Sequence, residues 1–249
     1  MNSKPSIFGV QFSNCTKDQA LNRLDELLQN AKQSGRTAFA AFINAHCMNI
    51  AYKDSQYTAI LQDHADVVWP DGIGIKLAGK LLGFKVPDNV NGTDLFPLIC
   101  GKSYSIYMLG AAPGVAQKAM ENAAAQFPAA RFVGASHGYF SEEYTEKTAI
   151  AQINALKPDI VLVGLGVPRQ EKWIAEHRDE LDCGVAIAVG GLLDFISGRI
   201  PRAPLWMRNH GLEWCYRLYQ EPIRLFKRYV IGNPLFLMRV ILERIGRKR

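Results

Sequence analysis

The stretch DIVLVGLGVPRQEKWI, residues 159–174, carries the clearest sign of the fold. Its first half is apolar without polar alternation, which is typical of a strand covered on both faces of a parallel sheet. Gly164 and Gly166 then allow a tight turn. Pro168 stands where a helix can begin without losing a hydrogen bond. The stretch therefore predicts a buried strand, a turn and a helix.

The same alternation of apolar runs and amphipathic segments continues through most of the chain. Strands are predicted over residues 37–43, 66–69, 104–109, 131–134, 159–164 and 184–189. Helices are predicted over residues 16–33, 47–64, 72–82, 93–101, 114–126, 142–156 and 168–181. This order indicates an α/β fold with a mainly parallel sheet flanked by helices.

The pattern changes after Arg199, where the strand signals end. We expect Pro222 and the Gly232-Asn233-Pro234 stretch to divide the remainder into about three short helices. We therefore divide the chain into an α/β domain, residues 1–200, and a basic amphipathic helical tail, residues 201–249.

Charge separates the same two parts. Residues 200–249 contain eleven lysines and arginines against three acids, a net charge of +8, so residues 1–199 carry −2 of the chain total of +6. Such a tail favours phosphate in some form: anionic lipid, nucleic acid or a phosphorylated substrate. Apolar side chains between the charges suit a helix lying on an anionic membrane, and equally a helical cap with solvated arginines.

Composition excludes several classes of protein. Hydrophobic residues make up 48% of the chain, enough for a sizeable core. The five cysteines are scattered without CxxC spacing, which argues against a disulfide framework or a zinc site and suits a reducing compartment. We see neither an apolar secretory leader nor a run resembling a membrane span, so we expect a cytoplasmic location.

Asp71 follows the strand predicted over 66–69 and opens the helix predicted over 72–82. Its carboxylate could cap that helix or accept a proton from a substrate. A cap would be stabilised by the helix dipole, which lowers the carboxyl pKa and weakens it as a base. Local sequence alone favours the cap.

Other polar or glycine-rich stretches also follow predicted strands, where ligands bind in open parallel sheets. After 104–109, the turn beginning at Gly110 could present helix amides to an anion, although an ordinary turn is favoured locally. After 159–164, Gln170 stands at a helix start where it makes a poor cap, which favours substrate contact. After 184–189, Asp194 could hold a ribose hydroxyl or make a local loop contact.

The absence of several motifs argues against further classes of binding site. The sequence has no GxGxxG dinucleotide fingerprint and no GxxxxGK[ST] phosphate loop. It also lacks a DxD metal clamp.

Taken together, the chain resembles the WecG/TagA/CpsF glycosyltransferases, glycosyltransferase family 26. The resemblance spans about Asn44 to Arg228. Its motifs, in family order, are PDGIGI (70–75), VNGTDL (90–95), LGAAPGVA (109–116), HGYF (137–140), GLGVPRQEKWI (164–174), VGGLLDFISGRIPRAP (189–204) and GLEWCYRLYQEPIR (211–224).

This resemblance implies a Rossmann-like fold and an inverting transfer without cofactor or metal. The expected donor is a UDP-sugar carrying ManNAc, its uronic acid, glucose or a similar sugar. The expected acceptor is a polyprenyl-diphosphate-linked saccharide used for teichoic acid, exopolysaccharide or another surface polymer. The tail would complete the active site and bring the protein to the anionic inner face of the plasma membrane. A homo-oligomer is left open.

The family also implies roles for individual residues. Asp71 would be the base, and glycines 72 and 74 would leave room for an acceptor sugar beside it. The other catalytic candidates are Gln170, Arg217 and Arg224. The substrate-binding candidates are Asn44, Asp94, Gly110, Ala111, Gly138, Tyr139, Gly164, Gly166, Pro168, Gly190, Asp194 and Arg202.

One motif departs from the family pattern. In PDNVNGTDL, residues 87–95, Asn89 stands where family members commonly have an arginine implicated in the site, and Asn91 replaces a small residue. The departure puts that role in doubt here and points to a different donor sugar or a subfamily. Two alternatives outside the family are a nucleic-acid-binding module with a basic tail and a Rossmann-type oxidoreductase, the latter disfavoured by the missing GxGxxG.

Overall fold

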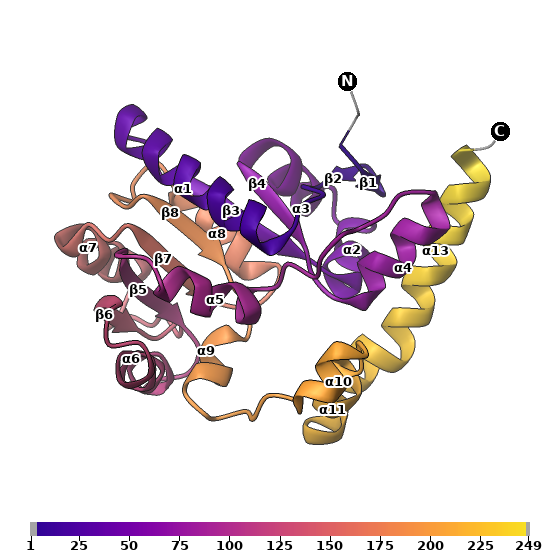
Figure 1. Ribbon diagram of the computed structural model, residues 1–249. Helices are drawn as coiled ribbons and strands as arrows, with labels where there is room; N and C mark the ends of the chain where they lie inside the picture. Colours follow the sequence, from indigo (N-terminus) through magenta and orange to yellow (C-terminus); the bar gives the residue numbers. More distant parts are fainter. Residues whose placement is uncertain (1–3, 248–249) are drawn as a thin grey trace.

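The computed structural model describes residues 4–247 and contains a six-stranded parallel sheet with the order β4-β3-β8-β7-β5-β6 (Figure 1). Its strands are β3 (Ala38–Ile43), β4 (Val67–Pro70), β5 (Ser105–Gly110), β6 (Arg131–Ser136), β7 (Ile160–Gly164) and β8 (Val185–Ala188). Each lies within two residues of its predicted range. The predicted α/β class and parallel sheet are confirmed.

Helices cover both faces of this sheet. One face carries α1 (Lys17–Ser34), α5 (Gly92–Cys100), α6 (Val115–Gln126) and α9 (Leu192–Ile196). The other carries α2 (Ala45–Ala51), α3 (Ser55–Ala59), α4 (Ile73–Leu82), α7 (Glu146–Leu156) and α8 (Arg169–His177). Two apolar clusters result, and the central strands contribute alternate side chains to each. Burial on both faces explains why these strands lack polar alternation.

Local sequence sets several helix ends. Thr16 and Gln19 form a capping box at the start of α1, and Gly35 ends that helix in the left-handed conformation. The helix predicted over 47–64 is interrupted, because Asp54 accepts a hydrogen bond from the Tyr57 amide at 2.9 Å and starts α3. A π-helical turn, η1 (Ile60–His64), follows α3. The sequence analysis also missed a short hairpin, β1 (Ser6–Ile7) and β2 (Val10–Gln11).

The tail forms α10 (Leu205–Asn209), α11 (Glu213–Gln220), α12 (Pro222–Phe226), the π-helical turn η2 (Lys227–Ile231) and α13 (Gly232–Arg247). The predicted break at Pro222 is confirmed, since Glu221 has a non-helical backbone. The predicted break at residues 232–234 is wrong. Pro234 falls in the first turn of α13, where its missing N–H costs little, and the widened turn of η2 leads the chain directly into that helix.

Helix α13 packs along α2 and α4 (Figure 1). Phe236 and Val240 are fully buried there and join the core. The Glu243 carboxylate accepts a hydrogen bond from the Phe8 amide at 3.2 Å and so ties α13 to the N-terminal hairpin. The division at residue 200 stays a prediction, and the last residues of the tail, Lys248 and Arg249, lie outside the described part. Within residues 4–247, no helix is both long and apolar enough to cross a membrane.

Candidate active site

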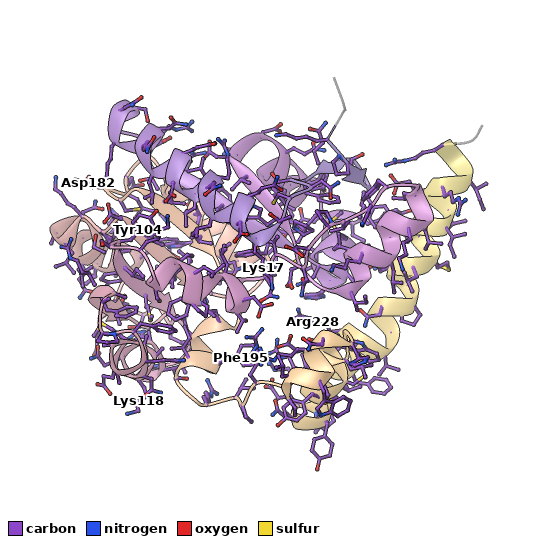
Figure 2. All side chains as sticks on the ribbon, viewed as in Figure 1. Lys17, Tyr104, Lys118, Asp182, Phe195 and Arg228 are labelled. Carbon is purple, nitrogen blue, oxygen red and sulfur yellow. The ribbon has the colours of Figure 1, made fainter. Side chains whose placement is uncertain are left out.

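A cavity of about 1170 Å³ lies at the carboxyl ends of the strands. Loops after β3, β4, β5, β6, β7 and β8 line it, and α11, α12 and η2 of the tail line it as well. Figure 2 labels two residues that line this cavity from different parts of the chain, Phe195 of α9 and Arg228 of η2. A cavity of this size can hold a nucleotide sugar together with part of an acceptor.

Asp71 lies in this cavity where β4 ends. Its amide donates to the Ile43 carbonyl at 2.8 Å, which keeps the ends of β3 and β4 together. Asn44 follows β3 and uses both ends of its side chain. Its oxygen accepts from the amides of His46 and Cys47 and caps α2, while its Nδ2 donates to Asp71 Oδ2 at 3.3 Å. The cap of one helix thereby positions the carboxylate at the next strand.

Burial raises the pKa of Asp71 to about 6, against the opposing effect of the hydrogen bond from Asn44. The negative charge of Glu213 in α11 raises the pKa further, and the positive charge of Arg228 lowers it. The tail therefore contributes to the electrostatic environment of this carboxylate. A carboxylate with a pKa near 6 is ionised at neutral pH and is a better proton acceptor than an ordinary aspartate.

The structure contradicts the interpretation of Asp71 as a helix cap. Gly72 occupies the N-cap position of α4, with no capping side-chain hydrogen bond. The Gly72 amide donates instead to the side-chain oxygen of Asn89. Gly72 has open space beside it, whereas a Cβ on Gly74 would lie 3.1 Å from the Ala45 side chain. Gly74 therefore serves close packing of α4 on α2.

Three glycines bring the ends of β5, β6 and β7 close together. A Cβ on Gly110 would lie 2.4 Å from the Gly164 carbonyl oxygen, and a Cβ on Gly138 would lie 2.2 Å from the Leu165 side chain. The Ala111 amide donates to the Gly164 carbonyl at 3.0 Å, and Ala111 faces the cavity. Gly110 packs beneath this wall and does not line the cavity.

Gln170 lines the cavity but is 98% buried, and both ends of its amide are engaged within the protein. Its oxygen accepts from the Gly190 amide at 2.9 Å, and its nitrogen donates to the Glu171 carboxylate at 2.9 Å. Gln170 therefore forms part of the cavity wall, and its expected contact with substrate stays a prediction. Pro168 precedes α8 and does not line the cavity.

Arginines from the tail form the opposite wall. Arg208, Arg217 and Arg228 line the cavity, and each has a buried Nε without a hydrogen-bond partner among the described residues. Arg217 lies over the Phe195 ring at 5.0 Å. Arg224 also lines the cavity, but its side chain is exposed and pairs with Glu221. Arg217 also lies 3.8 Å from the Glu221 carboxylate. Several guanidinium groups at one cavity wall are suited to binding an anion.

The two acidic residues expected to bind substrate, Asp194 and Asp94, form ion pairs within the protein. Asp194 lines the cavity but pairs with Arg199 at 3.3 Å, which matches the local-contact alternative. Asp94 lies outside the cavity lining, bonded to Arg202 and 3.2 Å from Lys17 Nζ. Although burial raises it, the hydrogen bond and charge of Arg202 hold the pKa of Asp94 below its usual value. This pairing fastens the start of the tail to α5.

A sequence model described as the glycosyl transferase WecG/TagA/CpsF family matches residues 5–249. The chain belongs to this family. It is therefore a glycosyltransferase, and the family assignment decides against the nucleic-acid-binding and oxidoreductase alternatives.

Two curated relatives of this transferase carry the same name, N-acetylglucosaminyldiphosphoundecaprenol N-acetyl-beta-D-mannosaminyltransferase. The protein from Bacillus subtilis (strain 168) is 32% identical over 215 residues, covering 85% of this chain and 82% of the relative. The protein from Staphylococcus aureus (strain MW2) is 28% identical over 242 residues, covering 96% and 92%. The similarity thus extends through the tail in the second case.

The cavity of the transferase gathers twelve of the sixteen residues expected to form the site; Asp94, Gly110, Pro168 and Arg202 do not line it. The sequence analysis missed several lining residues, including His46, Arg208, Glu213 and Arg228. His46 lies three residues past the end of β3, a position that could have marked it. Burial and the charge of Arg228 lower the pKa of His46 to about 4, so its imidazole is neutral at pH 7.

Proposed function

We propose that this transferase moves an N-acetylmannosaminyl group from a UDP-sugar to the N-acetylglucosaminyl group of a polyprenyl-diphosphate-linked acceptor. The names of the relatives support the transferred sugar and the acceptor. The binding of a UDP-sugar is supported chiefly by the arginine side chains, Arg208, Arg217 and Arg228, that line the cavity holding Asp71. Planar guanidinium groups pair well with diphosphate oxygens.

The chemistry is a single displacement with inversion. The acceptor hydroxyl oxygen attacks the anomeric carbon of the donor while Asp71 takes the hydroxyl proton. A glycosidic C–O bond forms, the C–O bond to UDP breaks, and UDP leaves with the bonding electron pair. One carboxylate suffices, because retention by double displacement would require a second one as nucleophile.

Stabilisation of the departing UDP falls to the arginines. Arg217 and Arg228 line the cavity from the tail, and their guanidinium groups can donate to the charge that develops on the diphosphate. No metal ion is required in this scheme. We expect transfer to continue in the presence of EDTA, and complete loss of activity on chelation would contradict that part of the proposal.

Gln170 and Asn44 hold the site in place. Asn44 donates to Asp71 and Gln170 holds the Gly190 amide, so each fixes a group at the cavity from the end of a neighbouring strand. We assign both as positioning residues. Arg217 is assigned to the donor diphosphate, and Arg224, exposed at the rim, to the acceptor diphosphate.

The acceptor is embedded in a membrane, so the cavity has to meet a bilayer surface. The tail exposes Tyr219, Ile223 and Phe226 beside Arg224 and Lys227, with Ile223 95% exposed. Apolar side chains among basic ones are typical of helices that lie on anionic membranes. We propose a peripheral position on the cytoplasmic face of the plasma membrane.

A donor screen tests the function directly. UDP release would be measured for a panel of UDP-sugars with a short-chain polyprenyl-diphosphoryl N-acetylglucosamine. We expect release with UDP-ManNAc that depends on the acceptor, and a product whose anomeric configuration is opposite to that of the donor by NMR. Acceptor-dependent release with none of the UDP-sugars, or retention of configuration, would refute the proposal.

A further inference from the structure

Glu171 is a fully buried acid in α8, next to the cavity but outside its lining. Its Oε1 accepts a hydrogen bond from Gln170 Nε2 at 2.9 Å, and its Oε2 has no hydrogen-bond partner among the described residues. None of the ion pairs within residues 4–247 includes it. A buried carboxyl with one unsatisfied oxygen costs stability, so its presence calls for a reason other than stability.

The hydrogen bonds around Gln170 give that reason. The Gly190 backbone amide can only donate, so Gln170 has to turn its oxygen toward Gly190, at 2.9 Å. The Gln170 nitrogen then faces Glu171 and needs an acceptor there. If the amide of Gln170 were reversed, its NH2 group would meet the N–H of Gly190. Glu171 therefore selects the orientation of Gln170 that holds Gly190 at the cavity wall.

The surroundings of Glu171 make this arrangement rigid. The titratable groups facing it are the Cys47 thiol from α2 and the Tyr57 hydroxyl from α3, both buried. Burial raises the pKa of Glu171 to about 7, while the hydrogen bond from Gln170 and the nearby Tyr57 hydroxyl lower it. Either protonation state of the carboxyl leaves an oxygen that can accept from Gln170.

We propose that Glu171 is a positioning residue for sugar transfer, acting through the amide of Gln170 on the Gly190 peptide at the cavity. This inference rests on the proposed function, because it assigns Glu171 a part in that reaction. Glu171 touches neither substrate nor Asp71 in this scheme. Its effect on activity should therefore run entirely through Gln170.

Two substitutions separate positioning from a merely structural role. Glu171→Gln keeps an oxygen toward Gln170 and should retain transfer within about threefold of the unmodified chain. Glu171→Leu removes the acceptor and fills the space with apolar atoms, so it exchanges one unsatisfied buried carboxyl oxygen for one unsatisfied amide nitrogen of Gln170. We expect Glu171→Leu to lower kcat by about 10- to 100-fold without lowering the melting temperature at pH 8. Glu176→Leu, an exposed acid on the same helix, is the matched control and should change neither.

A double-mutant cycle tests the route of the effect. If Glu171 acts through Gln170, Glu171→Leu should cause no further loss in a Gln170→Leu background. Full activity of the Glu171→Leu variant, losses that multiply in the double variant, or failure of Glu171→Gln to retain activity in a folded protein would overturn the proposal.

An NMR measurement tests the role of Glu171 independently of the proposed function. In protein labelled with 15N-glycine, the Gly190 amide resonance, assigned with Gly190→Ala, should move in Glu171→Leu and stay near its place in Glu171→Gln. If the unmodified chain transfers no sugar from any UDP-sugar, the proposed function fails while this measurement still reports on the hydrogen bonds. A Gly190 resonance that Glu171→Leu leaves unmoved would refute the role of Glu171.

Discussion

At the scale of single residues, the site holds Asp71 in surroundings that do not favour its charge. Burial raises its pKa to about 6 from an ordinary value of 3.8, despite the hydrogen bond from Asn44. The folded protein therefore binds a proton more tightly than the unfolded chain does. Between these two pKa values stability falls as pH rises, and the penalty remains at higher pH. The property that makes Asp71 a useful base also destabilises the fold.

Asp71→Asn removes this penalty along with the base. We expect the variant to be more stable than the unmodified chain at pH 8 by about 1–2 kcal/mol, since one pKa unit corresponds to about 1.4 kcal/mol and partial solvation reduces the effect. At pH 3.5, where the carboxyl is mostly protonated in both states, the difference should be much smaller. Thermal unfolding at both pH values measures it, and a variant destabilised at pH 8 would show that the carboxylate is a structural contact.

The pH dependence of transfer follows from the same pKa. The base has to be ionised, so kcat/KM should rise through about pH 6 and level off above pH 7. The profile should follow a single ionisation on its acidic side. Initial rates from pH 5 to 8 with saturating acceptor measure it. A flat profile across pH 5–7 would mean that no group with the pKa of Asp71 limits the reaction.

Asp71 could be picked out from the sequence as a site residue, but the charged side chains that surround it in the fold could not. Asp71 was identified by its place after a strand and by its family motif, whereas its cap role was wrong because Gly72 takes that position. Glu213 and Arg228, whose charges shift the pKa of Asp71, stand more than 140 positions after it in the sequence. Only the packing of the tail brings these charges near Asp71. Local sequence carries no sign of such neighbours.

At the scale of elements, the cavity is built from two sources. The strand ends supply Asp71 and the glycine-lined wall, while α11 and η2 supply Arg217 and Arg228. Asp94 and Arg202 fasten the connection between them. The donor diphosphate is expected to bind where the two sources meet.

Arg217 is the sharpest test of this arrangement. Its side chain is 85% buried and lies over the Phe195 ring at 5.0 Å, and its Nε has no partner among the described residues. Arg217→Ala should weaken UDP binding about 10- to 100-fold, as loss of a buried charged hydrogen bond does. Arg217→Lys should recover little of this, because lysine has no planar fork. Calorimetry with UDP measures both, with Arg244→Ala on α13, outside the cavity lining, as the control. Wild-type affinity in Arg217→Ala would remove this residue from the donor site.

Elements were predictable where a strong local pattern determines them. The apolar runs predicted the six parallel strands because burial on both faces leaves a clear signature. Two features were not predicted: the helix interruption at Asp54 and the continuous helix through Gly232. Both depend on hydrogen bonds, which the spacing of hydrophobic residues does not reveal. In the second case, a π-helical turn accommodates residues that usually end a helix.

At the scale of the whole molecule, the tail both joins the core and exposes an apolar surface. Phe236 and Val240 are fully buried against the α/β part, while Ile223 and Phe226 face outward beside basic residues. This is the surface that we propose to meet the membrane.

Vesicle binding tests that surface. The protein should sediment with vesicles containing phosphatidylglycerol, and less so as salt rises, because surface charges are screened. Ile223→Ser combined with Phe226→Ser should reduce binding by about tenfold or more. UDP affinity should stay unchanged, since neither side chain lines the cavity. Leu156→Ser, an exposed apolar residue of α7 in the α/β part, is the matched control. Unchanged vesicle binding in the double variant would place the membrane contact elsewhere.

The central claim is that Asp71 is the base of an inverting transfer from a UDP-sugar. The most direct measurement compares Asp71→Asn with the unmodified chain for two quantities, the rate of transfer from UDP-ManNAc to a short-chain polyprenyl-diphosphoryl N-acetylglucosamine and the affinity for UDP. We expect the rate to fall by at least about 100-fold while the affinity for UDP stays within about threefold. Transfer at the unmodified rate by the folded Asp71→Asn protein would contradict the account.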